Sequence, residues 1–86
     1  MSEYVKIYSL MEGTHMDYID RIIELRKDFG KTQRQIGKLI GKSQQGYAHI
    51  ENRRAKLNVD DFLTICNFFQ VTPNFVLGYS EHRTIR

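Results

Sequence analysis

The sequence predicts an all-α fold, a compact bundle of five helices between Asp17 and Gly78. Apolar residues recur at spacings of three and four in successive segments, which is the period of one helix face. Each segment is also bounded by residues that start or stop helices, such as serine, threonine, asparagine, glycine and proline. The chain has 86 residues, 41% of them hydrophobic, including five tyrosines and five phenylalanines. This is enough for the core of one domain.

The first two helices follow from this pattern. Residues 17–29 are predicted as the first helix, since their apolar side chains lie four, three and four residues apart, and Gly30 ends it. Thr32 offers an N-cap hydroxyl for a second, short helix over residues 33–40. Gly41 follows that helix and can adopt the positive φ common at helix ends.

Residues 44–52 are predicted as the third helix, with Ser43 as its N-cap. Only Tyr47, Ala48 and Ile50 form an apolar side on this helix. Because a helix that is polar on most faces gains little from burial, its surface is expected to serve a partner.

The last two helices follow a basic loop over residues 53–57. Asn58 is expected to cap a strongly apolar fourth helix. Its cysteine, Cys66, is expected to be a small buried hydrophobe rather than a reactive thiol. Thr72 and Pro73 predict the start of a short fifth helix that stops at Gly78.

The chain divides into an N-terminal extension (residues 1–16), the helical domain (17–79) and a C-terminal tail (80–86). Within the extension, Glu3 to Leu10 alternates weakly and is rich in β-branched and aromatic residues, so a short N-terminal β-strand is a further expectation. No apolar run approaches the roughly 18–20 residues that cross a bilayer, and no secretory signal is evident. The chain is therefore not expected to associate with a membrane. Because it has a single cysteine and can form no internal disulfide, a reducing cytoplasm is the expected location.

Charge is unevenly distributed along the chain. Residues 26–56 contain nine basic and two acidic residues, a net charge of +7, whereas the remainder has four basic and eight acidic residues, or −4. A basic block between acidic flanks suits a surface that faces phosphates and releases their counterions. An ordinary solvated surface would have the same distribution of charge. The residues between the charged ones must therefore distinguish a phosphate-binding surface from a solvated one.

A helix of about eight residues, a tight turn and a second helix, all within residues 33–52, have the spacing of a helix-turn-helix. Five short motifs in and near this segment are characteristic of one protein family. They are LR at Leu25-Arg26, TQ at Thr32-Gln33, the turn glycine Gly41, SQQ at Ser43 to Gln45 and IEN at Ile50 to Asn52. With these motifs, residues 17–79 resemble the lambda-repressor-like, Cro-type (XRE) family of DNA-binding domains. The resemblance implies a homodimer that reads a palindromic operator in double-stranded DNA, as a repressor.

The third helix is expected to read bases. Gln44 and Gln45 lie at its exposed start, and a glutamine amide can make two hydrogen bonds to an adenine edge. His49 lies one turn beyond Gln45 on the same face and could contact a base or a phosphate. The predicted phosphate contacts are Gln33, Lys42, Ser43, Asn52, Arg54 and Lys56, with Arg53 beside them in the loop. The resemblance assigns Arg26 and Glu51 to a structural ion pair between the first and third helices.

The chain departs from the family's pattern at four positions. Gly37 replaces the usual alanine, and its missing side chain is expected to let two helices approach closely. Lys31 and Lys42 replace apolar turn residues and add charge where a phosphate could lie. Arg53 occupies the position of the usual helix-ending glycine.

A single recognition helix spans too few base pairs to be selective, so a homodimer is expected. Phe75, Val76 and Tyr79 near the end of the chain are the predicted interface, with the strand at residues 3–10 as a second choice.

Two other functions remain open: an antitoxin or immunity-type module that binds a protein and autoregulates, and a protein-interaction domain that has lost DNA binding. Gln44, Gln45 and the basic block argue against the last. No carboxylate pair, serine elbow or glycine-rich phosphate loop is present, so no catalytic residue, metal, cofactor or small-molecule ligand is predicted.

Overall fold

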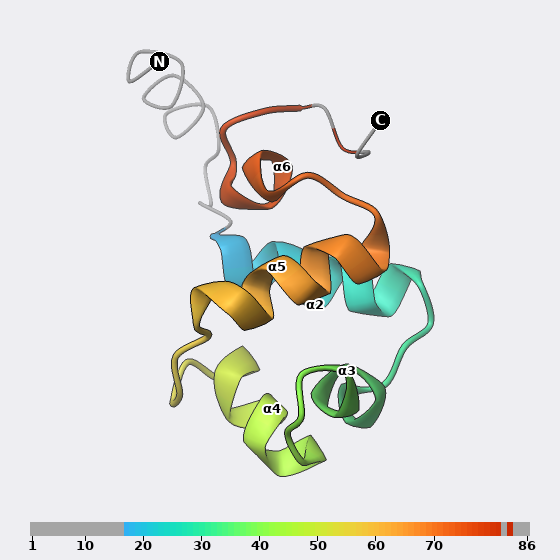
Figure 1. The fold of residues 1–86 in the computed structure, drawn as a ribbon, viewed down its shortest axis with the longest axis vertical. Helices are drawn as coiled ribbons and strands as arrows, with labels where there is room; N and C mark the ends of the chain where they lie inside the picture. The colour runs from blue at the N-terminus through green and yellow to red at the C-terminus, as the bar shows by residue number, and fades with distance from the viewer. Residues whose placement is uncertain (1–16, 82, 84–86) are drawn as a thin grey trace.

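Five helices account for most of residues 17–81 and 83, the part of the chain that the computed structural model describes (Figure 1). They are α2 (Tyr18–Asp28), α3 (Gln33–Leu39), α4 (Gln44–Glu51), α5 (Val59–Phe69) and α6 (Pro73–Leu77). The predicted all-α bundle is therefore confirmed. The predicted ends of α2, α3 and α4 differ from the observed ones by a single residue. The strand expected at residues 3–10 lies outside the described residues.

A side chain caps the start of every described helix, which explains why the helices begin where they do. In α2, the Asp17 carboxylate accepts from the Asp20 backbone N–H at 2.9 Å, and the Asp20 carboxylate accepts in return from the Asp17 N–H. Thr32 and Gln35 form the same reciprocal box at the start of α3. The caps of α4, α5 and α6 are the side chains of Ser43, Asn58 and Thr72.

The helices form three levels (Figure 1). Helices α2 and α5 occupy the middle, α6 covers one side of them, and the α3–α4 pair covers the other. Accordingly α2 contacts both α4 and α6, and α5 contacts both α3 and α6. The α3–α4 pair therefore projects from one end of the bundle, away from α6.

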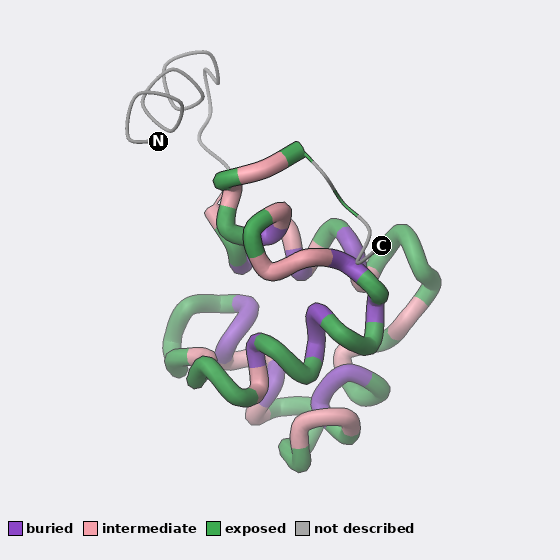
Figure 2. Tube along the Cα trace, turned by 45° about the horizontal axis from the view of Figure 1, so that its top comes forward, coloured by how far each residue is buried: buried purple, intermediate pink, exposed green. Residues whose placement is uncertain are grey.

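The core lies between these levels, where the buried stretches of the helices face one another (Figure 2). Its buried members are Ile19, Ile22, Leu25, Ile36, Tyr47, Ile50, Phe62, Ile65, Cys66, Phe69, Val71 and Val76. Tyr47 and Ile50 hold α4 against the core together with the buried Glu51, whereas Gln44 and Gln45 at its start are exposed. No helix in the described part of the chain is long and apolar enough to cross a membrane.

Two sequence expectations meet different outcomes in this core. Cys66 is 2% exposed, and burial raises the pKa of its thiol to about 11, so its reading as a buried hydrophobe is confirmed. Val76 was expected at a dimer interface, but it is only 1% exposed. Because α6 packs this residue against the core, Val76 has no surface to offer a second copy, and the predicted interface is corrected to exclude it.

Candidate nucleic-acid interface

The turn between α3 and α4 is short and folds back onto α3. The backbone N–H groups of Ile40 and Lys42 both donate to the carbonyl oxygen of Gly37, at 3.1 and 2.8 Å. Gly41, inside the turn, has a φ of 73°, a left-handed conformation that glycine adopts without steric cost. The turn therefore sets α4 at a defined angle to α3.

Gly37 lies where the turn and α4 leave no room for a side chain. A Cβ atom at this position would lie 2.9 Å from the carbonyl oxygens of both Lys42 and Ser43, and 3.2 Å from the Cβ of Tyr47. The glycine in place of the family's alanine thus allows the close approach expected from the sequence.

The start of α4 is presented to solvent at the end of the bundle away from α6. Ser43 Oγ accepts from the Gly46 N–H at 3.0 Å and so satisfies one of the free donors of the first turn. Gln44 and Gln45 follow directly and are both exposed, whereas His49, one turn further, is half-buried. The two glutamines are therefore the side chains of α4 that are most accessible to a bound partner.

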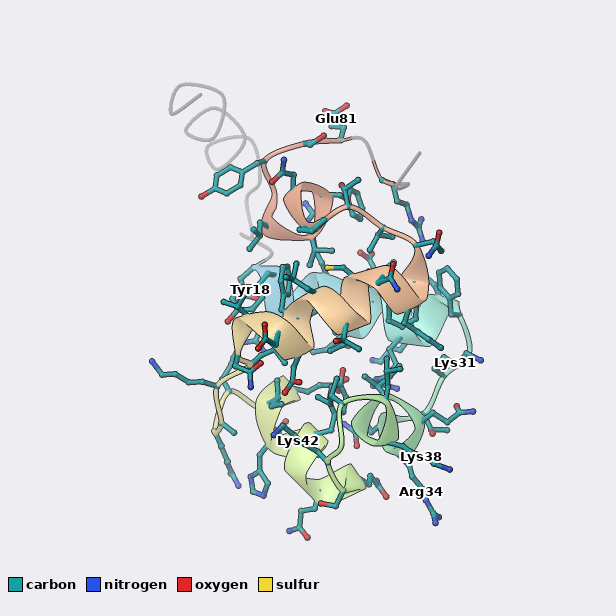
Figure 3. All side chains as sticks on the ribbon, in the orientation of Figure 1. Tyr18, Lys31, Arg34, Lys38, Lys42 and Glu81 are labelled. Carbon is teal, nitrogen blue, oxygen red and sulfur yellow. The ribbon has the colours of Figure 1, made fainter. Side chains whose placement is uncertain are left out.

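Three hollows lined by basic side chains surround this part of α4. The first is lined by Arg26, Lys31, Arg34 and Gln44, among others, and the second by Arg34, Gln44 and two lysines, Lys38 and Lys42. Gln44 thus lies between two hollows that share Arg34. Figure 3 shows Arg34, Lys38 and Lys42 together at this end of the molecule, remote from Glu81.

The third hollow lies on the other side of α4. Its lining includes Lys42, Ser43, His49 and Lys56, so it brings together four residues predicted to contact DNA. The loop that carries Lys56 is tied to α4 because the Ala55 N–H donates to the His49 carbonyl at 3.1 Å. Concave basic surfaces on both sides of the glutamines are suited to the two phosphate backbones that flank a major groove.

Arg34 and Lys38 belong to the basic segment, but the sequence motifs do not assign them to the site. Both are exposed on α3 and line the second hollow. Their spacing of four residues, which places them on one helix face, was the signal that could have identified them.

The ion pair that the resemblance implies between Arg26 and Glu51 is present and tightly enclosed. Arg26 Nε and Nη2 donate to the two Glu51 oxygens at 2.6 and 3.1 Å, and Arg26 Nη1 donates to the Lys31 carbonyl at 3.0 Å. The Arg26 and Glu51 side chains are 12% and 6% exposed. This pair joins α2 to the last residue of α4 and thereby limits how α4 can rotate.

Gln33 also belongs to this cluster. Its Nε2 donates to Glu51 Oε1 at 3.0 Å, which ties the start of α3 to the end of α4. An amide NH₂ has two hydrogens, so the same group can donate its second hydrogen to a phosphate at the first hollow, which Gln33 also lines. The predicted phosphate contact and this internal bond are therefore compatible.

The cluster alters the acidity of its members. Burial by itself would raise the pKa of Glu51, but hydrogen bonds from Arg26 and Gln33 outweigh it and hold that pKa below its ordinary value. The hydrogen bonds to Glu51 raise the pKa of Arg26 against the effect of burial. Burial, followed by the nearby Glu51 carboxylate, raises the pKa of Tyr47. Glu51 is thus ionised at neutral pH, and the Tyr47 hydroxyl is neutral.

Arg53 makes contacts that the sequence did not indicate. Its Nη2 donates to one oxygen of Asp17 at 2.8 Å and of Asp20 at 2.7 Å, and its Nη1 donates to the Glu51 carbonyl at 2.9 Å. Its φ of 62° is the left-handed conformation for which the family uses glycine. Arg53 therefore connects the end of α4 to the cap of α2, while Asn52, Arg54 and Lys56 are exposed.

The residues predicted at the dimer interface are not equally accessible. The Phe75 ring is half-buried, with the guanidinium carbons of Arg21 and Arg83 at 5.3 and 5.9 Å from its centroid. Tyr79 is 50% exposed. The Thr72 N–H donates to the Arg83 carbonyl at 2.8 Å, which brings that part of the tail back to the start of α6.

The described residues contain no group of three or more His, Cys, Asp or Glu side chains placed to hold a metal ion. What the site does contain is amide groups, cations and helix N-termini, which are the groups that proteins use against bases and phosphates.

A family model described as helix-turn-helix matches residues 22–76, more than half of the chain. No curated protein and no solved structure gives a significant match. The matched segment contains α3, α4 and the turn between them, together with most of α2, all of α5 and most of α6.

Proposed function

The chain belongs to the helix-turn-helix family of the lambda-repressor-like type, and on that premise we propose that it is a sequence-specific DNA-binding regulator. In this proposal it represses transcription by occupying a palindromic operator as a homodimer in the cytoplasm. The observation that carries the proposal is the exposure of Gln44 and Gln45 at the start of α4, with basic hollows on both sides.

The two glutamines supply the base recognition. In the major groove, adenine offers N7 as an acceptor and its N6 amino group as a donor, and one glutamine amide can satisfy both. Gly46 adds no bulk beside them, so the helix backbone can come close to the bases. His49 is half-buried in the third hollow. We therefore assign it to the edge of the contact rather than to its centre.

The hollows supply the phosphate contacts. Lys42 lies between the second and third hollows, and Lys56 lines the third. Gln33 and Ser43 add polar groups at the starts of α3 and α4, where backbone N–H groups favour anions. Asn52 and Arg54 extend the proposed contact along the loop after α4. Arg34 and Lys38 complete it on the side of α3.

Dimerisation is proposed through the region around Phe75 and Tyr79. Tyr79 is the better position for a test, because half of its surface is exposed and its replacement leaves the core intact. Phe75 packs against the core, so its replacement by a charged residue would damage the fold as well. Sedimentation of the Tyr79→Asp variant, with and without operator, tests this part, and a monomer of the natural sequence on DNA would refute it.

Selection of bound sequences from a random duplex library tests the proposal as a whole. The expected result is an enriched inverted repeat whose half-sites lie about 10 base pairs apart, the spacing that places two recognition helices on one face of the duplex. The matched control is Asn67→Ala on the exposed surface of α5, outside the three basic hollows and the proposed dimer interface, which should enrich the same sequence. Absence of enrichment with the natural sequence would contradict DNA recognition.

A further inference from the structure

A second surface feature is lined by none of the residues that line the three basic hollows. It is an apolar groove of about 340 Å³ between the starts of α2 and α5 and the helix α6. Tyr18, Val59, Leu63 and Leu77 line it and are 36%, 70%, 45% and 45% exposed. Figure 3 shows Tyr18 near the start of α5, well separated from Arg34 and Lys38.

The concentration of apolar surface here is not explained by the DNA interface. These four residues are more than half of the seven large hydrophobic side chains that are exposed within the described part of the chain. Single exposed hydrophobic residues are common on proteins, but several around one groove mark an interaction site. Tyr18 also packs edge-on against Phe62 in the groove floor, with ring centroids 5.9 Å apart, so the groove has a firm wall.

The chain contains a segment of matching chemistry close by. Residues 4–10 read YVKIYSL, with five large apolar or aromatic side chains among seven residues. The buried core residues of the described part of the chain lie between Ile19 and Val76. Six residues, 11–16, connect this segment to Asp17, which immediately precedes Tyr18 in the groove wall. Extended, six residues reach about 20 Å, enough to return along the groove.

We propose that residues 4–10 of the same chain bind in this groove and cover its apolar side chains. A tethered segment of this length has an effective concentration in the millimolar range, so a small apolar contact suffices to hold it. A second copy would need a much larger contact, since stable interfaces bury about 800 Å² on each partner. A groove that accepts only a few side chains therefore suits the tethered segment better than a protein face.

The proposal is independent of the proposed DNA-binding function. The groove belongs to α2, α5 and α6, whereas the base-reading glutamines lie at the start of α4. Occupation of the groove is therefore tested by a signal from the groove itself, without DNA.

Paramagnetic broadening in the full chain gives that signal. A nitroxide is attached to the Lys6→Cys variant, which leaves the apolar side chains of the segment in place. Cys66 does not compete for the label, because it is 2% exposed and burial raises the pKa of its thiol to about 11. The expected result is loss of the Leu63 and Leu77 amide signals, while those of Gln44 and Gln45 remain.

Two substitutions on α5 provide the control. Leu63→Asp places a charge in the groove and should restore the sharp Leu77 signal, whereas Phe68→Asp, at an equally exposed site of the same helix outside the groove, should not. Unshifted amide signals of the core residue Ile36 establish that both variants are folded. Groove signals that remain sharp in the labelled natural background would overturn the proposal.

A mixed sample separates the segment of the same chain from that of a second copy. Isotope-labelled chains without nitroxide are combined with nitroxide-labelled chains of natural isotope content. The proposal predicts no broadening of Leu63 and Leu77 in this mixture. Broadening there would show that the groove binds the segment of another copy, and the proposal in its stated form would be wrong.

Discussion

Replacement of Gly37 by alanine tests whether the turn of the helix-turn-helix depends on close packing. Helix propensity alone favours alanine over an interior glycine by about 1 kcal/mol. The structure opposes this gain, because the new Cβ would lie 2.9 Å from two backbone oxygens, where ordinary contact begins at 3.4 Å. The carbonyls of Lys42 and Ser43 would therefore have to move by about half an ångström.

Overpacking of this kind costs about 1–3 kcal/mol, so the net expectation for Gly37→Ala is a loss of about 1 kcal/mol. For a domain of this size the loss corresponds to a Tm lower by about 4–8 °C. Operator affinity should fall as well, because Ser43 caps the recognition helix and its displacement tilts Gln44. Thermal unfolding followed by circular dichroism measures the first effect, and fluorescence anisotropy with labelled operator measures the second.

Gly46→Ala is the matched control for stability. Its Cβ would meet only the Ser43 Oγ at 3.3 Å and the Lys42 Cβ at 3.6 Å, both side-chain atoms. Its Tm should be unchanged or higher, by an amount that corresponds to at most about 1 kcal/mol. If Gly37→Ala raised the Tm as much as Gly46→Ala does, the argument from close approach at Gly37 would be refuted.

Four further predictions concern binding, pH and the loop after α4. Operator affinity should fall by orders of magnitude between about 50 and 200 mM salt if a dimer makes roughly 6–10 phosphate contacts, and a flat response in a titration series would contradict them. Gln44→Ala or Gln45→Ala should lose about 1–3 kcal/mol of binding free energy on the preferred operator and relax the preference at one base pair. Lys56→Ala should instead weaken binding to all duplexes alike. An unchanged base preference in the glutamine variants would mean that another element reads the bases. Folding lowers the pKa of Glu51, so its carboxylate stabilises the fold fully above the ordinary pKa of 4.5, and this stabilisation is lost as the pH falls through the folded-state pKa. The free energy of unfolding in urea should therefore depend less steeply on pH for Glu51→Gln than for the natural sequence. Equal slopes would argue against the ion pair with Arg26. Arg53→Ala should have a lower Tm than Arg53→Gly. Both variants lose the contacts with two carboxylates, but only glycine adopts the φ of 62° without steric strain. Equal Tm values would show that the backbone is not strained.

Local sequence determined the helices and the order in which they occur. Side chains such as Thr32 and Ser43 satisfy backbone N–H groups three residues away, so the start of a helix can be predicted from a few neighbouring residues. The same range of information located the turn at Gly41 and the exposed glutamines after it. The one-residue error at Asp17 has the same local origin, because an aspartate before an apolar stripe can be a cap or a first helical residue.

The assignment of Arg26 and Glu51 as partners came from the resemblance and not from spacing. Their charges are 25 residues apart in sequence, and each could have paired with other groups. The additional bond from Gln33 to Glu51, 18 residues away, was not predicted. A family motif can therefore supply one contact across the fold without supplying the contacts around it.

Only the tertiary structure decided which surface each helix presents and which distant groups meet. Arg53 is 33 residues from Asp20, and nothing near either residue indicates that the end of α4 packs beside the start of α2. The same packing buries Val76 and leaves Leu63 and Leu77 exposed around a groove, although all three are apolar. Periodicity and caps act over three or four residues, whereas these contacts depend on the angles between helices, which the packing of the whole core sets.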